Sequence, residues 1–190
     1  MIGDLDKTLK LLLENELAHL ATAVDVTFVP PDEKFKPTAP TIDLFVYDVR
    51  ENRDLRSNEW LLEKQGNRQA TRKRAPVRVD CSYLITAWAG DPESEHRLLG
   101  EVMRVLLNHP TIPDGILQDD LAGQTPPLPT ATLQPGRLQS LGEFWQALGG
   151  KPKAALNYTV TIGVQVHKPV ELTMVTEKEL KFRVEKEVVS

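Results

Sequence analysis

The chain has 190 residues, of which 41% are hydrophobic and 26% charged, and its formal net charge is −4 at pH 7. A domain of this size buries roughly 70% of its unfolded surface and needs neither disulfides nor a structural metal. The mild negative charge argues against a general nucleic-acid binder. No apolar run approaches the roughly 18 residues of a membrane span, and the acidic N-terminus lacks a secretory signal. We therefore expect a soluble, cytoplasmic domain, with Cys81 as a small core residue in a reducing compartment.

The first fifty residues predict a helix followed by strands. Between residues 2 and 20, leucine and isoleucine recur every three or four positions, which is typical of an amphipathic helix. Residues 24–29 form a short apolar run, and the prolines that follow it prevent a central strand before Thr41. The segment 41–49 is apolar on both of its faces, which favours a strand inside a sheet.

The segment from residue 50 to residue 78 shows no hydrophobic periodicity apart from an apolar island at residues 60–62. We expect it to be a long irregular excursion between strands. Residues 64–78 contain basic side chains and no acidic one, namely Lys64, Arg68, Arg72, Lys73, Arg74 and Arg78. Three interpretations of this positive run remain open: a solvated loop, a protein contact, or a nucleic-acid contact. Base stacking is disfavoured because the run contains no aromatic residue.

The second half of the chain predicts more sheet and two more helices. Alternation over residues 77–89 predicts a long strand, and Asp91, followed by proline and glutamate, predicts a helix start. The proline-rich segment 110–136 leaves room for one short strand at 129–134. A short helix at 140–148 ends at a glycine pair. The cleanly alternating segment 156–166 predicts a strand with an antiparallel neighbour.

Beyond Pro169 the chain alternates apolar with charged residues, as in Leu180, Phe182 and Val184, which predicts an extra strand or arm. The expected fold class is α/β (α+β), a mostly antiparallel or mixed β-sheet with helices packed on one face. We expect the domain to occupy residues 1–168 and the C-terminal arm to occupy residues 169–190.

Searches for catalytic motifs give no candidate. The four histidines do not form the His-Glu-x-x-His pattern of a zinc enzyme, and the single Glu93-x-x-His96 half-motif lacks the second copy that a di-iron site needs. The glycine pair before Lys151 lacks the spacing of a phosphate-binding loop. Cys81 lies on an apolar face that disfavours a thiolate. We predict no enzyme, no cofactor, no metal and no catalytic residue. A hydrolase with an unrecognised convergent site remains an alternative.

Several segments carry a resemblance to a known family. They are PTIDLFVYDVREN at residues 40–52, NEW at 58–60, VRVDCSYLITAW at 77–88, DPESEHR at 91–97 and LQSLGEFW at 138–145. Over residues 2–166 the chain resembles the small cap proteins of extracellular contractile injection systems, which are related to phage tail terminators. These segments are structural patterns without a catalytic signature, and the C-terminal arm matches the family least.

The resemblance implies a tail-terminator-like fold and a homo-oligomeric ring, expected to have six copies, that contacts the sheath protein and the inner tube protein. Stacked rings have no intrinsic stopping point, and such a cap would end their growth and hold the distal sheath to the tube. It implies no nucleic acid, no small-molecule substrate and no direct membrane contact, and assembly in the cytoplasm into a particle that can be released. An adaptor for another part of the particle is the main alternative.

The residues expected at the subunit, sheath or tube interface come from two places in the chain. The basic run is expected to lie on a loop that faces the sheath or tube, and the C-terminal arm is expected to donate a strand to another subunit. The full set is Lys64, Arg68, Arg72, Lys73, Arg74, Leu180, Phe182 and Val184.

Overall fold

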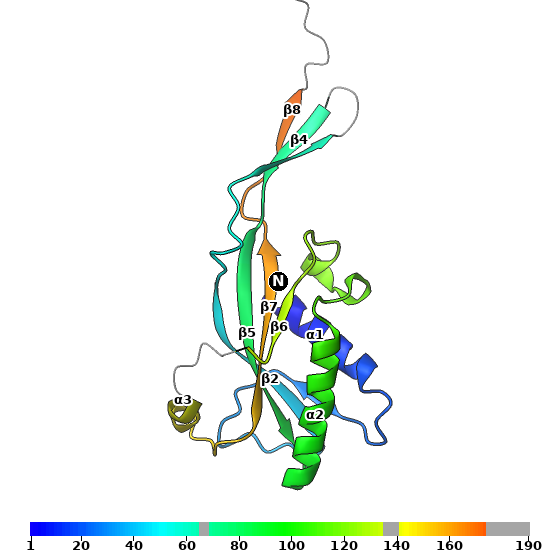
Figure 1. Cartoon of the computed structure of the whole chain (residues 1–190), viewed down its shortest axis with the longest axis vertical. Helices are drawn as coiled ribbons and strands as arrows, with labels where there is room; N and C mark the ends of the chain where they lie inside the picture. The colour runs from blue at the N-terminus through cyan, green and yellow to red at the C-terminus, as the bar shows by residue number, and fades with distance from the viewer. Residues whose placement is uncertain (65–68, 135–140, 174–190) are drawn as a thin grey trace, which may run out of the picture. The chain divides into compact units, whose positions relative to one another are not determined.

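A computed structural model of the chain describes residues 1–64, 69–134 and 141–173, and these residues form two compact units, each with its own sheet (Figure 1). The first unit consists of residues 1–56 and 77–164, and the second is built from residues 57–76 together with the segment that starts at residue 165. The expected division after residue 168 stays a prediction, because most of residues 169–190 lie outside the described residues.

The first unit is built on a five-stranded sheet with the order β1-β2-β5-β7-β6. β1 (Asp25–Thr27) is parallel to β2 (Thr41–Glu51), and every other pair is antiparallel: β2 with β5 (Val77–Trp88), β5 with β7 (Ala155–Val164), and β7 with β6 (Thr130–Thr132). The expected mixed, mostly antiparallel sheet is confirmed.

Three helices and two short 3₁₀ turns accompany this sheet in the described part of the chain. The helices are α1 (Ile2–Glu16), α2 (Pro92–Asn108) and α3 (Leu141–Ala147), and the turns are η1 (Asp114–Ile116) and η2 (Asp119–Leu121). The predicted start of α2 is confirmed, because the Asp91 side chain accepts a hydrogen bond of 3.0 Å from the Ser94 backbone N–H.

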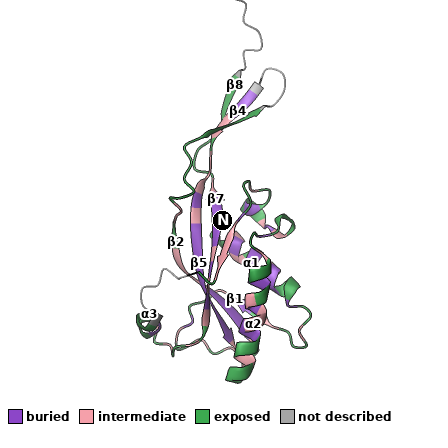
Figure 2. Cartoon of the chain, viewed as in Figure 1, coloured by how far each residue is buried: buried purple, intermediate pink, exposed green. Residues whose placement is uncertain are grey.

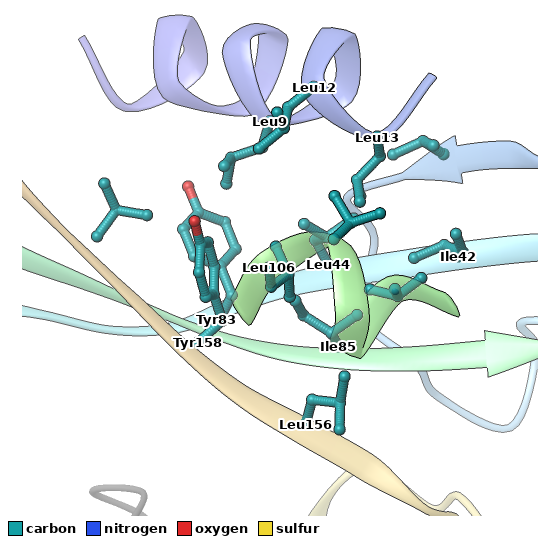
Figure 3. Packing of buried hydrophobic residues seen from close by; sticks show 14 of the residues in the cluster. Leu9, Leu12, Leu13, Ile42, Leu44, Tyr83, Ile85, Leu106, Leu156 and Tyr158 are labelled. Atoms are coloured by element: carbon teal, nitrogen blue, oxygen red, sulfur yellow. The ribbon is translucent and has the colours of Figure 1, made fainter. Parts of the chain in front are cut away.

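The main core lies between the sheet and the helices α1 and α2 (Figures 2 and 3). Alternation along β2 and β5 sends every second residue toward these helices, where Leu9, Leu44 and Ile85 are fully buried. Cys81 is also fully buried, and burial raises the pKa of its thiol to about 11. Its predicted role as a small core residue is confirmed.

The opposite face of the same sheet is divided between an apolar end and a polar end. At the apolar end, Phe144 of α3 packs against Phe45 with 6.1 Å between ring centroids. At the polar end, hydrogen bonds join neighbouring strands: Thr161 Oγ1 donates to Asp80 Oδ1 at 2.7 Å, and Asn52 Nδ2 donates to the same oxygen at 3.0 Å. Cross-strand hydrogen bonds therefore tie this polar end together.

A side-chain amide protects part of the outer edge of β7. β6 pairs only with residues 158–160 of β7. Farther along that edge, Gln124 Nε2 donates to the Gly163 carbonyl at 2.8 Å, and Gln124 Oε1 accepts from the Gly163 N–H at 2.7 Å. The amide thus takes the place of a neighbouring strand and reduces the backbone groups available for unwanted strand pairing.

The second unit contains a three-stranded antiparallel sheet with the order β3-β4-β8. The strands are β3 (Trp60–Lys64), β4 (Gln69–Arg74) and β8 (Val170–Thr173). The expectation of an irregular excursion here is wrong for residues 60–64 and 69–74, because these two segments pair with each other in a regular ladder. β8 follows directly after Pro169, whereas the alternating residues Leu180, Phe182 and Val184, from which an extra strand was expected, lie outside the described residues, so that strand stays a prediction.

Candidate interaction surface

The register of the small sheet sorts its side chains onto two faces. Directly paired residues share a face, and successive residues alternate between faces. The pairs Trp60 with Arg74, Leu62 with Arg72, Arg72 with Val170, and Ala70 with Leu172 define one side, which we name the cationic face. The other side, which we name the mixed face, carries Leu61, Glu63, Thr71, Lys73 and Glu171.

The cationic face is organised around Trp60. The guanidinium carbon of Arg72 lies 3.7 Å from the centroid of the indole ring, and that of Arg74 lies 4.8 Å from it. Both distances are within the range of cation–π attraction, which contributes about 0.5–1 kcal/mol at exposed sites. Among the described residues neither arginine has a carboxylate partner within salt-bridge distance. Within the described part of the chain their charges are therefore uncompensated, and the ring favours one orientation of each guanidinium.

Apolar side chains surround this stack and remain accessible. Trp60 is 43% exposed, Leu62 52% and Val170 51%, and Leu172 is exposed to a similar degree. The described residues of the second unit include no helix, so within this unit neither face of the sheet is covered by one. The cationic face is thus an apolar surface on which the charged groups of known position are all positive.

Lys73 has a different role from its two neighbours. It lies on the mixed face and forms a salt bridge with Glu63 on the adjacent strand. The expectation that Arg72, Lys73 and Arg74 form one basic group on a loop is therefore wrong in two respects. All three lie on a strand, and one of them is neutralised across the strand pair.

The structure does not place the side chains of the remaining predicted interface residues on the cationic face. Lys64 ends β3 with its backbone opposite Ala70. Arg68, Leu180, Phe182 and Val184 lie outside the described residues.

Arg78, the last member of the basic run, belongs to the first unit. It lies on β5 and is only 6% exposed, and burial lowers the pKa of its guanidinium. One of its nitrogens is close to the carbonyl oxygens of Pro127 and Thr161, at 3.3 and 3.4 Å. Arg78 therefore supports the interior of the first unit and offers no charge to a partner.

Sequence reasoning missed the contribution of Trp60 and of residues 170–172. The apolar island at residues 60–62 was visible, but three consecutive apolar residues are too few to indicate a strand. An apolar–charged–apolar pattern at residues 170–172 was also present, and it could have suggested a partner for that island.

The first unit contains a polar hollow of about 490 Å³ that was considered as a possible enzyme cleft. Its lining is Asp48, Arg50, Glu51, Asn52, Arg53, Asp54 and Asp80. Much of its charge is used internally: Arg50 Nε lies 2.5 Å from Asp48 Oδ2, and Arg56 pairs with Glu51. In the described ranges no three His, Cys, Asp or Glu side chains come together as a metal site requires. The hollow contains no nucleophile paired with a base.

Solved structures with the same fold are tube terminators of contractile injection systems. One is the sheath/tube terminator of the PVC extracellular contractile injection system in its extended state, with a TM-score of 0.69, 26% identity, and coverage of 100% of this chain and 65% of that chain. Another is the tube-terminating cap of the anti-feeding prophage, with a TM-score of 0.67, 26% identity, and coverage of 96% and 62%. The fold is therefore of the tube-terminator class.

The family model described as the Pvc16 N-terminal domain matches residues 4–171, so the chain belongs to the Pvc16 N-terminal domain family. The resemblance drawn from the sequence is confirmed. The chain spans less than two thirds of the length of the two solved terminators. No curated protein matches it significantly by sequence.

Of the helices that the structure describes, none has the length and apolar character needed to cross a membrane.

Proposed function

We propose that this chain caps the end of a contractile injection system and terminates its tube and sheath. The observation that carries the proposal is the match of the whole chain, at a TM-score of 0.69, to a sheath/tube terminator. The second solved neighbour is also a terminating cap, and membership of the same family extends over residues 4–171.

The physical task of such a protein is to end an open assembly. Tube and sheath rings stack head to tail, and each new ring presents the docking surface for the next one. A ring of this chain, expected to contain six copies, would bind the last sheath and tube rings and present no further docking surface. Its durable contacts would also keep the distal sheath attached to the tube during contraction.

This role requires binding surfaces and no chemistry. Both solved neighbours are structural terminators, which supports a non-enzymatic protein. The partners are then further copies of the chain, the sheath protein and the inner tube protein. Assembly takes place in the cytoplasm before any release of the particle.

The contacts are proposed to come from the small sheet and the C-terminal segment. Lys64, Arg72, Lys73 and Arg74 belong to β3 and β4, and Arg68 stands between these strands in the sequence; the guanidinium groups of Arg72 and Arg74 lie against Trp60 on the cationic face. Leu180, Phe182 and Val184 are proposed to add a strand to a neighbouring subunit, because backbone hydrogen bonds supply affinity and alternate side chains supply specificity.

The function is tested by removing this chain from cells that produce the particle and imaging the particles by electron microscopy. Without the chain we expect tubes of uncontrolled length and sheaths that detach or contract prematurely. Restoring the wild-type chain with a small label should place the label at the end opposite the baseplate. Particles of normal length in its absence contradict the proposal, and a label at the baseplate favours the adaptor alternative.

The contribution of the C-terminal segment is tested with a matched pair of variants. Leu180→Ser/Phe182→Ser/Val184→Ser should reduce the fraction of capped particles. The interleaved control, with Lys181, Arg183 and Glu185 changed to Ser, should leave it near the wild-type value. Both variants retain β8 and its pairing with β4. Equal effects of the two variants contradict a donated strand with one specific face.

A further inference from the structure

The cationic face combines two properties that rarely occur together on an unpartnered surface. Its apolar side chains are about half exposed, which is unusual for a contiguous patch on an isolated protein and marks interaction sites. Its arginines carry no carboxylate partner in the described residues, and the Trp60 ring already holds them in place. A fitting partner therefore has apolar groups flanked by carboxylates.

The first unit of the same chain carries the negative charge that would complement the arginines of the cationic face. Residues 57–76 have five basic and two acidic side chains, a net charge of +3, and residues 165–190 have five of each. Residues 1–56 and 77–164 have 13 basic and 20 acidic side chains, a net charge of −7. The total of −4 thus conceals a positive second unit and a strongly negative first unit.

Nucleic acid fits the cationic face poorly. Leu62, Val170 and Leu172 offer nothing to a phosphate backbone, and one side of the Trp60 ring is occupied by an arginine. A polyanion would also be repelled by the net charge of −7 on the remainder of the chain. Complementary charge with apolar contact at the centre is instead the pattern of a protein–protein interface.

We infer that the cationic face binds the acidic first unit of a second copy of this chain. The inference rests on the proposed function and deepens it by naming the surface that joins neighbouring subunits. Two different surfaces meet in such a contact, which is therefore heterologous, and repeated heterologous contacts generate a ring when the rotation closes.

The test uses the purified full chain and measures its association state by sedimentation velocity over a range of protein concentrations. The central comparison is Leu62→Ser with Leu61→Ser. These are adjacent residues of the same type on β3, both exposed, on opposite faces of the sheet. We expect Leu62→Ser to weaken self-association by about tenfold, because it replaces an exposed apolar side chain at the centre of the proposed contact with a polar one. Leu61→Ser should remain close to the wild type.

A charge-reversal variant tests the electrostatic part. Arg72→Glu/Arg74→Glu should abolish self-association at low salt, whereas Glu171→Lys, on the mixed face, should not. Raising the salt concentration should weaken association of the wild type, because the Debye length falls from about 10 Å at 0.1 M to about 3 Å at 1 M. Circular dichroism of each variant checks that the chain remains folded.

Several outcomes would overturn the inference. They are a wild-type chain that stays monomeric at every concentration, equal weakening by Leu61→Ser and Leu62→Ser, and self-association that Arg72→Glu/Arg74→Glu leaves intact. Binding of a DNA oligonucleotide by the wild type that the charge reversal abolishes would also overturn it. Imaging of particles separates this result from the proposed function. If Leu62→Ser caps particles normally and self-associates as well as the wild type, the proposed interface is wrong but the proposed function stands. If the wild-type chain self-associates but is not found at the end of the particle, the proposed function is wrong but the interface stands.

Discussion

Replacing Asp43 with asparagine should change how the stability of the chain depends on pH. Asp43 lies on β2 and is fully buried. Its Oδ1 accepts hydrogen bonds from Thr27 Oγ1 at 3.1 Å and from the Val29 N–H at 3.0 Å, while no described residue is a partner for Oδ2. Burial raises the pKa of this carboxyl from 3.8 to about 7, because the charged form loses more hydration than these two donors return.

The sign and size of the effect follow from linkage. The folded chain holds the Asp43 proton between about pH 4 and pH 7, where the unfolded chain releases it, so this residue's stabilising contribution declines as the pH rises through that range. A shift of about three units at about 1.4 kcal/mol each corresponds to a loss on the order of 4 kcal/mol by pH 8. Asparagine does not titrate, so the free energy of unfolding of Asp43→Asn should rise relative to the wild type by up to that amount.

The assay is urea unfolding of both proteins, followed by tryptophan fluorescence, at intervals from pH 4.5 to pH 8. The difference between the two free energies of unfolding isolates Asp43 from the other carboxyl groups, whose titrations are common to both proteins. A difference that stays constant over this range refutes the argument. A wild type that gains stability over Asp43→Asn with rising pH refutes it as well, because that result indicates a carboxyl whose pKa is lowered on folding.

Three further substitutions, one of which serves as a comparison, test local packing by the same urea assay. Gln124→Ala removes both hydrogen bonds to the Gly163 backbone and should cost about 1–3 kcal/mol; an unchanged midpoint would mean that water replaces the amide without penalty. Gly150→Ala would place a Cβ 3.2 Å from Cε3 of the buried Trp145 ring, and it should lower the free energy of unfolding by about 1–3 kcal/mol. Gly100→Ala lies in α2, where a Cβ meets nothing within 4 Å, and it should raise the free energy of unfolding by roughly 0.5–1 kcal/mol. Equal effects at the two glycines would contradict the close approach at Gly150.

The elements that could be predicted from the sequence are those whose signal is local and repeated. β5 has 12 residues with apolar side chains at alternate positions, and α2 begins at a capping aspartate followed by proline, so neither depends on a distant partner. β3 and β4 lack such a signal. Their apolar and basic residues fall on both faces, and their regular structure becomes evident only when one strand is laid beside the other.

The same limit explains what could be predicted of the interaction surface. The excess of positive charge near residue 72 can be counted directly in the sequence, so it could be predicted. Which cation stays uncompensated depends on register: Arg72 lies over Trp60, and Lys73, one position farther on, faces the other way and meets Glu63. A shift of one residue in strand pairing would exchange these roles. The resemblance to a family could identify the fold without specifying this register.

The pairing of β4 with β8 also determines when the cationic face can exist. Arg72 and its partner Val170 are separated in the chain by β5, α2, β6, α3 and β7. During synthesis the strands β3 and β4 are therefore made early, while the apolar residues that complete their surface emerge only after the sheet of the first unit has been translated. A nascent chain therefore carries Arg72 before Val170 has been made. If the cationic face joins subunits as proposed, a chain becomes able to dock through it only after the first unit has been synthesised.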